Sequence, residues 1–186
     1  MMKKIGIIAD THFTQERKLH LDVIDFFSDV SLILHAGDIG DPKEFKKLKR
    51  VAPVIAVMGN KTEDRYNYCL KDTEIITIDG LKILLTHGLG NTFTNYFEYF
   101  VGKILQFKAL SFNLMIKRLN KQTDKEVCLV VFGHLHQVYV KYVDGRLFVN
   151  PGAAYTTSDS KRVGSVAKVI LRNNHICEVL IHYLIP

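Results

Sequence analysis

The sequence is poor in cysteine and has no long apolar run. Its 186 residues include only Cys69, Cys128 and Cys177, which are odd in number and widely spaced. Neither a disulfide framework nor a cysteine zinc site fits this pattern. No apolar stretch approaches the roughly 20 residues of a membrane-spanning helix, and the start of the chain does not resemble a signal peptide. We therefore expect a cytoplasmic protein that does not act in a membrane.

Charged residues of both signs are common in the chain, with an excess of basic ones. The chain is 47% hydrophobic and 24% charged, which is typical of one globular domain, here spanning residues 1–186. The formal net charge is +6, and basic residues cluster between Lys43 and Arg50. This run favours anionic partners. A lysine-rich helix face is more often a solvated surface, however, and no nucleic-acid-binding motif is recognisable. Nucleic acid is thus an alternative partner, not the favoured one.

Two kinds of segment follow one another along the chain. Up to about residue 58, β-branched runs alternate with helical patterns around 17–28 and 42–50, as in parallel βαβ units. Later, hairpins are predicted at Asp79-Gly80, Asp144-Gly145 and Asn173-Asn174. Parallel βαβ units followed by hairpins indicate two sheets that pack face to face, with helices on the outside. The expected fold class is α/β, with a four-layer α/β/β/α sandwich of two mixed sheets.

A long segment rich in aromatic residues interrupts the second half. Between about residues 89 and 125, apolar side chains recur near helical spacing, which predicts one or two helices. Lysines at positions 103, 108, 117 and 121 exclude a membrane span. We expect this helical insert to pack on the sandwich. A lid, or a contact that forms a homo-oligomer, is the alternative.

Polar residues follow the ends of five apolar strands. They are Asp10 and His12 after IGIIA, Asp38 after LILHAG, Asn60 after VIAVMG, His87 after KILLT, and His134 and His136 after VVFG. Because loops converge at the carboxyl edge of an α/β sheet, these side chains are expected to meet. Each motif is weak by itself. Together they would form a costly polar cluster unless divalent cations were bound there.

The ordered set D-x-H, G-D, G-N, H-G and G-H-x-H resembles the calcineurin-like metallophosphoesterase superfamily. The short length, the phrase LHAGDIG and the later VNPGA narrow the resemblance to the small YfcE-type phosphodiesterases. This resemblance implies one metal held by Asp10, His12, Asp38 and His136, and a second held by Asp38, Asn60, His87 and His134. Asp38 would bridge the two ions, and Asn60 and His134 would also serve catalysis. Mn²⁺ is the expected ion, with Ni²⁺, Zn²⁺ or Fe as alternatives.

A centre of this kind predicts hydrolysis of a phosphodiester. Two divalent ions about 3.5–4 Å apart would share a hydroxide that attacks phosphorus directly, without a protein nucleophile. Thr11 is therefore interpreted as a spacer. We expect a small or nucleotide-like substrate. The alternatives are a phosphomonoesterase, a nuclease, and a non-catalytic protein-binding scaffold like the metallophosphoesterase-like subunit of retromer. That all seven ligand positions are filled favours the enzyme.

Residues beside the expected ligands depart from the family pattern. Relatives often read G-N-H-[DE] or G-N-C-D, whereas residues 61–64 read KTED here. Lys61 is expected either to contact a substrate phosphate or to point into solvent. Leu89 stands where close relatives often carry histidine, which puts their substrate preference in doubt for this chain. His35 is expected to orient Asp38 and not to bind metal itself.

Overall fold

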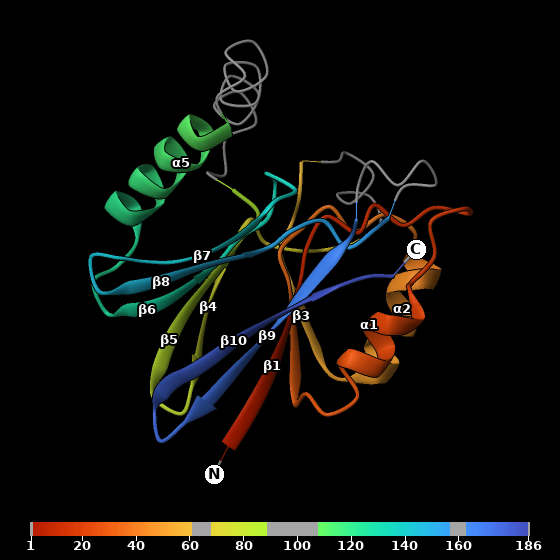
Figure 1. Cartoon of the computed structure of the whole chain (residues 1–186), viewed down its shortest axis with the longest axis horizontal. Coiled ribbons are helices and arrows are strands. Elements are labelled where there is room, and N and C mark those ends of the chain that lie inside the picture. Colours follow the sequence, from red (N-terminus) through yellow and green to blue (C-terminus); the bar gives the residue numbers. More distant parts are fainter. Residues whose placement is uncertain (1, 61–67, 89–107, 157–162, 186) are drawn as a thin grey trace.

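Two five-stranded mixed sheets pack face to face, with helices on their outer sides (Figure 1). This computed structural model describes residues 2–60, 68–88, 108–156 and 163–185, with side chains in helix α5 described from residue 113 onward. The layered α/β/β/α arrangement expected from the sequence is confirmed.

The first sheet has the strand order β10-β9-β1-β2-β3. Its strands are β1 (Met2–Ile8), β2 (Leu32–His35), β3 (Val54–Ala56), β9 (Ser165–Arg172) and β10 (His175–Tyr183). The central strand β1 runs parallel to β2 and antiparallel to β9. Helices α1 (Leu21–Phe26) and α2 (Pro42–Val51) cover the outer face of this sheet, where Phe27, Ile33 and Leu48 are buried in a common cluster.

The second sheet has the strand order β4-β5-β6-β8-β7. Its strands are β4 (Thr73–Ile78), β5 (Leu81–Thr86), β6 (Val127–Val131), β7 (Val138–Val143) and β8 (Arg146–Pro151). Helix α5 (Lys108–Gln122) packs on its outer face through Met115, Ile116 and Leu119. A helix is therefore confirmed in the described part of the insert expected at 89–125, whereas residues 89–107 lie outside the described residues.

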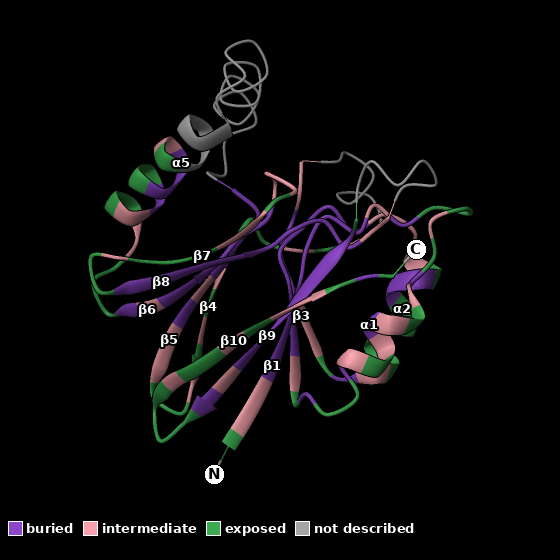
Figure 2. Cartoon of the chain, viewed as in Figure 1, coloured by how far each residue is buried: buried purple, intermediate pink, exposed green. Residues whose placement is uncertain are grey.

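The main core lies between the two sheets. Ile7 and Leu34 from the first sheet belong to one buried cluster with Ile83, Leu129 and Val149 from the second. Buried positions accordingly run along the central strands, and exposed positions gather on outer strands and helix surfaces (Figure 2). Burying apolar area on both sides of a sheet stabilises it at about 25 cal/mol per Å². The loops at the sheet edge are thus attached to a well-packed support.

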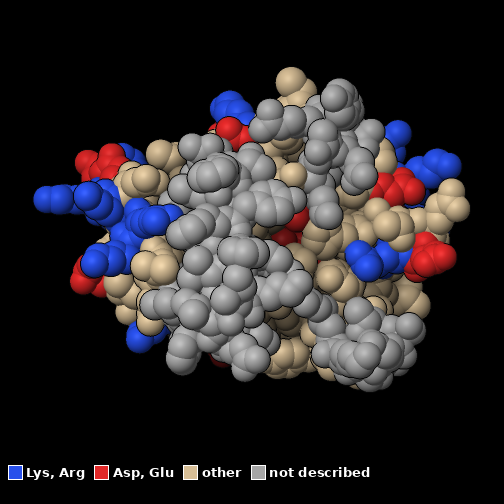
Figure 3. All heavy atoms as spheres, turned by 90° about the horizontal axis from the view of Figure 1, so that it is seen from above, with Lys and Arg blue, Asp and Glu red and all other residues tan. Residues whose placement is uncertain are grey.

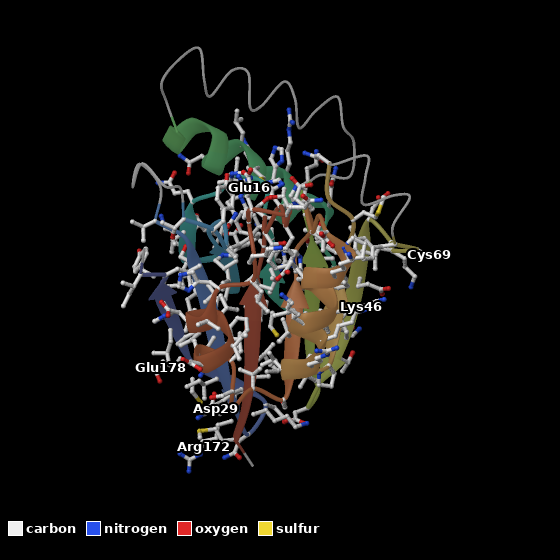
Figure 4. The ribbon with its side chains drawn as sticks, turned by 90° about the vertical axis from the view of Figure 1, so that its right-hand side faces the viewer. Glu16, Asp29, Lys46, Cys69, Arg172 and Glu178 are labelled. Atoms are coloured by element: carbon white, nitrogen blue, oxygen red, sulfur yellow. The ribbon has the colours of Figure 1, made fainter. Side chains whose placement is uncertain are left out.

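Helix α2 shows how local sequence sets one boundary and one face. The Asp41 side chain accepts a hydrogen bond from the Lys43 backbone N–H at 2.7 Å, and Pro42 follows as the first helical residue. Phe45 is buried toward the sheet, whereas the lysines of the basic run are exposed. Lys46, for example, lies on α2 along the side of the sandwich (Figure 4). Among the described helices, none is long and apolar enough to cross a membrane.

Helix α1 is shorter than the segment 17–28 that the sequence predicted. The Thr14 hydroxyl accepts hydrogen bonds from the backbone N–H groups of Glu16 and Arg17 at 3.2 and 2.9 Å. This turn diverts the backbone from a helix. The helix begins only after His20, whose Nδ1 accepts a hydrogen bond from the Asp22 N–H at 3.2 Å. Arg17 is consequently left in the loop that follows β1.

All three predicted hairpins are confirmed. They join β4 to β5, β7 to β8 and β9 to β10, and each turn has two central residues with positive φ. The φ values are 49° and 79° at Asp79-Gly80, 49° and 78° at Asp144-Gly145, and 48° and 61° at Asn173-Asn174. Two positive φ angles in succession define the type I′ turn, which matches the natural twist of paired strands.

Candidate metal centre

The loops predicted to carry the ligands leave the same edge of the sandwich and are hydrogen-bonded to one another. The Asp10 N–H donates to the Gly37 carbonyl at 3.0 Å, and the His12 N–H donates to the Asp38 carbonyl at 2.9 Å. The His134 N–H donates to the Asp10 carboxylate, with 3.0 Å to Oδ2. Viewed onto this edge, acidic atoms are visible near the middle of the face, whereas Lys and Arg side chains lie toward its sides (Figure 3).

One group of four side chains has the spacing of ligands around a single cation. One ligand atom from each of Asp10, His12, Asp38 and His136 lies within 4.8 Å of the other three. His136 Nε2 lies 3.2 Å from His12 Nε2 and 3.3 Å from Asp10 Oδ1. Two ligand atoms that each lie about 2.0–2.2 Å from one ion would be separated from each other by distances like the two just given. The grouping coincides with the first ligand set that the sequence predicted.

The second predicted group meets the first at Asp38. The same oxygen, Asp38 Oδ2, lies 3.6 Å from His12 Nε2 and 3.6 Å from His87 Nε2. On the far side, the rings of His87 and His134 lie 5.3 Å apart, nearly perpendicular, and Asn60 Nδ2 is 2.8 Å from His134 Nδ1. All seven predicted ligand residues are therefore brought together at this edge.

The histidine nitrogens indicate what this cluster would bind. His87 Nδ1 donates to the Ala36 carbonyl at 2.7 Å, so in the neutral ring Nε2 carries a lone pair. That lone pair faces the Asp38 carboxylate, and two electron-pair donors facing each other need a cation between them. Among the residues that the structure describes, His87 Nε2 and His134 Nε2 are buried without a hydrogen-bond partner. Imidazole, carboxylate and amide groups suit Mn²⁺, Ni²⁺, Zn²⁺ and Fe, so the residues fit the expected metals.

The backbone of the site is also unusual. The angle φ is positive at Asp10 (51°), His12 (43°), Asp38 (55°), His134 (72°) and His136 (52°). Left-handed backbone is uncommon outside glycine and costs on the order of 1 kcal/mol or more per residue. It persists only where surrounding contacts hold it, and such residues gather at functional sites. Five of the seven predicted ligand residues are therefore held in an uncommon backbone conformation by the contacts at this edge.

Glycine before a ligand residue provides space for the ligand groups. A Cβ atom at Gly59 would lie 2.0 Å from Asp38 Oδ1. A Cβ atom at Gly133 would lie 2.7 Å from the Ala36 carbonyl oxygen and 3.0 Å from Asp10 Oδ2. The glycines of the G-N and G-H-x-H motifs are thus explained by close approach of neighbouring loops.

Burial and neighbouring charges shift the ionisation of the cluster. Burial raises the pKa of Asp10, but a hydrogen bond with His136 and nearby histidine charges outweigh it, so the pKa lies below its usual value. Burial, with the charge of His87, lowers the pKa of His134 to about 4. Asp10 is therefore ionised and His134 neutral near pH 7, which are the protonation states that metal ligands require.

His35 and Thr11 form a buried contact beneath the ligand loops. Thr11 Oγ1 donates to the Ile39 carbonyl at 2.9 Å and lies 3.0 Å from His35 Nε2. Since the hydroxyl proton is used, His35 donates from Nε2 to this oxygen. Thr11 is therefore more than the spacer expected from the sequence, because it links His35 to the loop that carries Asp38. Burial lowers the pKa of His35 to about 3, so its ring is neutral.

Three residues near the ligands were not predicted as site residues. Asn150, from the N-P-G segment, donates from Nδ2 to the Gly133 carbonyl at 2.8 Å and so supports the G-H-x-H loop. Tyr155 presents an edge-on contact to the rings of His12 and His136. Arg17 stacks on Tyr155. The N-P-G motif in the sequence indicated Asn150, but no sequence pattern indicates that Arg17 and Tyr155 are in contact. The predicted contact residue Lys61 lies outside the described residues, as does Leu89.

Comparisons with known proteins agree with this geometry. The profile described as "Calcineurin-like phosphoesterase superfamily domain" matches residues 2–174. A probable metallophosphoesterase of Methanocaldococcus jannaschii is 33% identical over 150 residues, which cover 80% of this chain and 67% of the relative. A phosphodiesterase of the same organism is 29% identical over 167 residues, covering 80% of this chain and 82% of that protein.

The fold is also similar to that of a solved structure. Vps29 of Chaetomium thermophilum superposes with a TM-score of 0.67 at 15% identity, covering 97% of this chain and 95% of that one. At this level of identity, the likeness concerns the fold alone.

Proposed function

We propose that this chain, which belongs to the calcineurin-like phosphoesterase superfamily, hydrolyses phosphodiesters at a centre for two divalent cations. One observation carries the proposal. Asp38 Oδ2 lies 3.6 Å from a histidine nitrogen of each ligand group, His12 Nε2 on one side and His87 Nε2 on the other. A carboxylate in that position can bridge two ions, as the seven-residue pattern requires.

Each ligand group would hold one ion. Asp10, His12, Asp38 and His136 would bind the first, and Asp38, Asn60, His87 and His134 the second. We propose Mn²⁺ as the ion, with Ni²⁺, Zn²⁺ and Fe as alternatives. Bound ions of this type supply positive charge to phosphate oxygens and lower the pKa of a coordinated water.

The protein's own contribution is orientation. The hydrogen bond from His87 Nδ1 to the Ala36 carbonyl fixes the ring so that Nε2 faces Asp38. The Asp10 carboxylate accepts a hydrogen bond from the His134 N–H. This bond fixes the loop that carries Asp10 relative to the loop that carries His134 and His136. Such outer contacts typically change metal affinity or activity by 10- to 100-fold when removed.

A small or nucleotide-like phosphodiester is the proposed substrate. The relative named as a phosphodiesterase supports this class. The sequence supports it as well, because no histidine follows Asn60 to protonate a poor leaving group. We keep Lys61 as a proposed phosphate contact. A phosphomonoesterase or a nuclease on the same site would use the same ions.

The test is hydrolysis after controlled metal loading. Protein stripped of metal is reloaded separately with Mn²⁺, Ni²⁺, Zn²⁺ or Mg²⁺, and turnover of bis(4-nitrophenyl) phosphate is compared with that of 4-nitrophenyl phosphate. We expect the diester to be hydrolysed faster, with Asp38→Asn and His87→Ala each losing at least about 10²- to 10³-fold in kcat. Asp144→Asn, in an exposed turn, is the matched control and should retain wild-type turnover.

Two results would redirect the proposal. A faster monoester reaction would identify a phosphomonoesterase, and turnover of nucleic acid that falls steeply with salt would identify a nuclease. If metal-loaded wild type were no more active than Asp38→Asn on any phosphoester, the enzyme would be excluded. The competing protein-binding scaffold would then lead.

A further inference from the structure

Arg17 lies beside the first ligand group and is held there from two sides. Its guanidinium carbon is 4.0 Å from the centre of the Tyr155 ring, and its Nη1 donates to the His12 carbonyl at 3.3 Å. The Tyr155 ring is 5.8 Å from the His12 ring and 6.1 Å from the His136 ring. Tyr155 therefore contacts both the arginine and two predicted metal ligands.

The loop that carries Arg17 is preformed. The Thr14 hydroxyl accepts the N–H groups of Glu16 and Arg17, and the Thr14 N–H donates to the Arg17 carbonyl at 3.1 Å. Glu16, the neighbour of Arg17, lies at the ligand-bearing end of the sandwich, opposite to Asp29 and Arg172 (Figure 4). Little conformational entropy would be lost when a guanidinium held in this way meets a ligand.

The charge of Arg17 is not neutralised by any residue that the structure describes. Among the described residues, no carboxylate forms an ion pair with it, and only Nη1 makes a hydrogen bond. The neighbouring Lys18 differs, because its Nζ lies 3.9 Å from the buried Glu44 carboxylate. A half-buried guanidinium with spare N–H donors, next to a cluster expected to bind cations, is positioned for an anion and not for the cations themselves.

We propose that Arg17 is a substrate-binding residue that donates hydrogen bonds to a non-bridging phosphate oxygen, and that Tyr155 is the positioning residue that holds its guanidinium. This inference rests on the proposed function, because it assigns a second phosphate contact to the same site. A planar guanidinium suits phosphate because two N–H groups can approach two oxygens together. A purely structural role, in which Arg17 only supports the His12 carbonyl, predicts a loss of metal affinity instead.

Binding of inorganic phosphate separates these roles. Metal content, the phosphate dissociation constant by calorimetry, and kcat and KM for bis(4-nitrophenyl) phosphate are measured on the Mn²⁺-loaded full chain. For Arg17→Met we expect full metal content, with phosphate affinity about 10- to 100-fold weaker and a higher KM. Arg17→Lys should recover part of the loss. Lys18→Met removes the same charge from the adjacent residue and should bind phosphate like wild type.

Tyr155 variants test the positioning role. Tyr155→Phe keeps the ring and should bind phosphate within a few-fold of wild type, whereas Tyr155→Leu should weaken it about 3- to 10-fold, the range of a cation–π contact. Equal phosphate affinity in wild type and Arg17→Met would overturn the inference and leave the proposed function intact. The inference would also be overturned if the metal content of Arg17→Met fell in proportion to its phosphate affinity. Phosphate binding that depends on Arg17, without turnover of any phosphoester by wild type, would support the contact and overturn the proposed function.

Discussion

Left-handed backbone occurs in two regions of this molecule with opposite properties. Among the described residues, nine other than glycine have positive φ. Four lie in the hairpin turns, namely Asp79, Asp144, Asn173 and Asn174, and five are predicted metal ligands. The turn residues are exposed, whereas Asp10 is fully buried and Asp38 is 5% exposed. The same dihedral angle is therefore maintained by different forces.

In the turns, the conformation follows from local chemistry. Asp and Asn tolerate positive φ, and a type I′ turn suits the twist of the strands that it joins. At the ligand edge, bonds between loops hold the conformation, such as the 2.9 Å hydrogen bond from His12 N–H to the Asp38 carbonyl. The turns thus serve folding, whereas the strained backbone of the ligand edge is maintained at a cost in stability, as is typical of functional sites.

Of the substitutions that compare the two regions, that of Gly59 should have the largest effect, and it should fall on function as well as on stability. The added methyl group of Gly59→Ala would lie 2.0 Å from Asp38 Oδ1 and 2.2 Å from the Asp38 backbone nitrogen, so both the carboxylate and the loop that carries it must move. Because a misplacement of about 1 Å can cost on the order of 10²-fold in rate, we expect at least that loss in kcat, together with weaker metal binding. Turnover and metal titration measure both. Wild-type turnover by Gly59→Ala would show that Asp38 is not fixed by the glycine.

The turns were predictable from sequence because their causes are local. Asp79-Gly80 and Asp144-Gly145 each lie between two β-branched runs, and this pattern is sufficient for a hairpin. The ligand residues were also predictable, because each follows an apolar strand and parallel strands end at one edge. Their division into two groups that share Asp38 was implied by the resemblance to the calcineurin-like superfamily and not by the strand pattern.

What the sequence could not provide depends on tertiary contacts. The β9–β10 hairpin pairs with β1, a choice made by packing across the whole chain. The helix predicted from about residue 17 begins at Leu21, because the Thr14 side chain competes for backbone N–H groups. The contact between Arg17 and Tyr155 joins loops 138 residues apart, and neither residue belongs to a ligand motif.

Acid should destabilise the ligand edge of the metal-free protein. Burial lowers the pKa of His35 to about 3 and that of His134 to about 4. Below pH 6.5 the unfolded chain gains protons on these rings, whereas the folded chain does not until pH approaches 4 and then 3. Stability is thus complete above pH 6.5 and falls on acidification, by up to about 1.4 kcal/mol per pH unit for each histidine.

Denaturant unfolding at pH 7, 6 and 5 measures this slope. His35→Gln should reduce it, because the variant lacks one of the two rings that ionise only on unfolding. His175→Gln, at an exposed position beside the Asn173-Asn174 turn, should leave the slope at its wild-type value. An unchanged slope in His35→Gln would mean that the ring takes up protons over the same pH range in the folded and unfolded states.

Substitution of Gly145 should have the smallest effect, and it should fall on stability alone. A Cβ atom at Gly145 meets no atom within 4 Å, so the cost of Gly145→Ala is that of an alanine at a φ of 78°. This is about 1–2 kcal/mol in the free energy of unfolding. Gly145→Asn should cost less, because Asn174 already occupies the equivalent position of the third hairpin at a φ of 61°. Urea denaturation of the three proteins gives this order, and turnover should stay at the wild-type level. A loss of turnover in Gly145→Ala comparable to that in Gly59→Ala would mean that the turns and the ligand edge are coupled, so that strain in one is felt in the other.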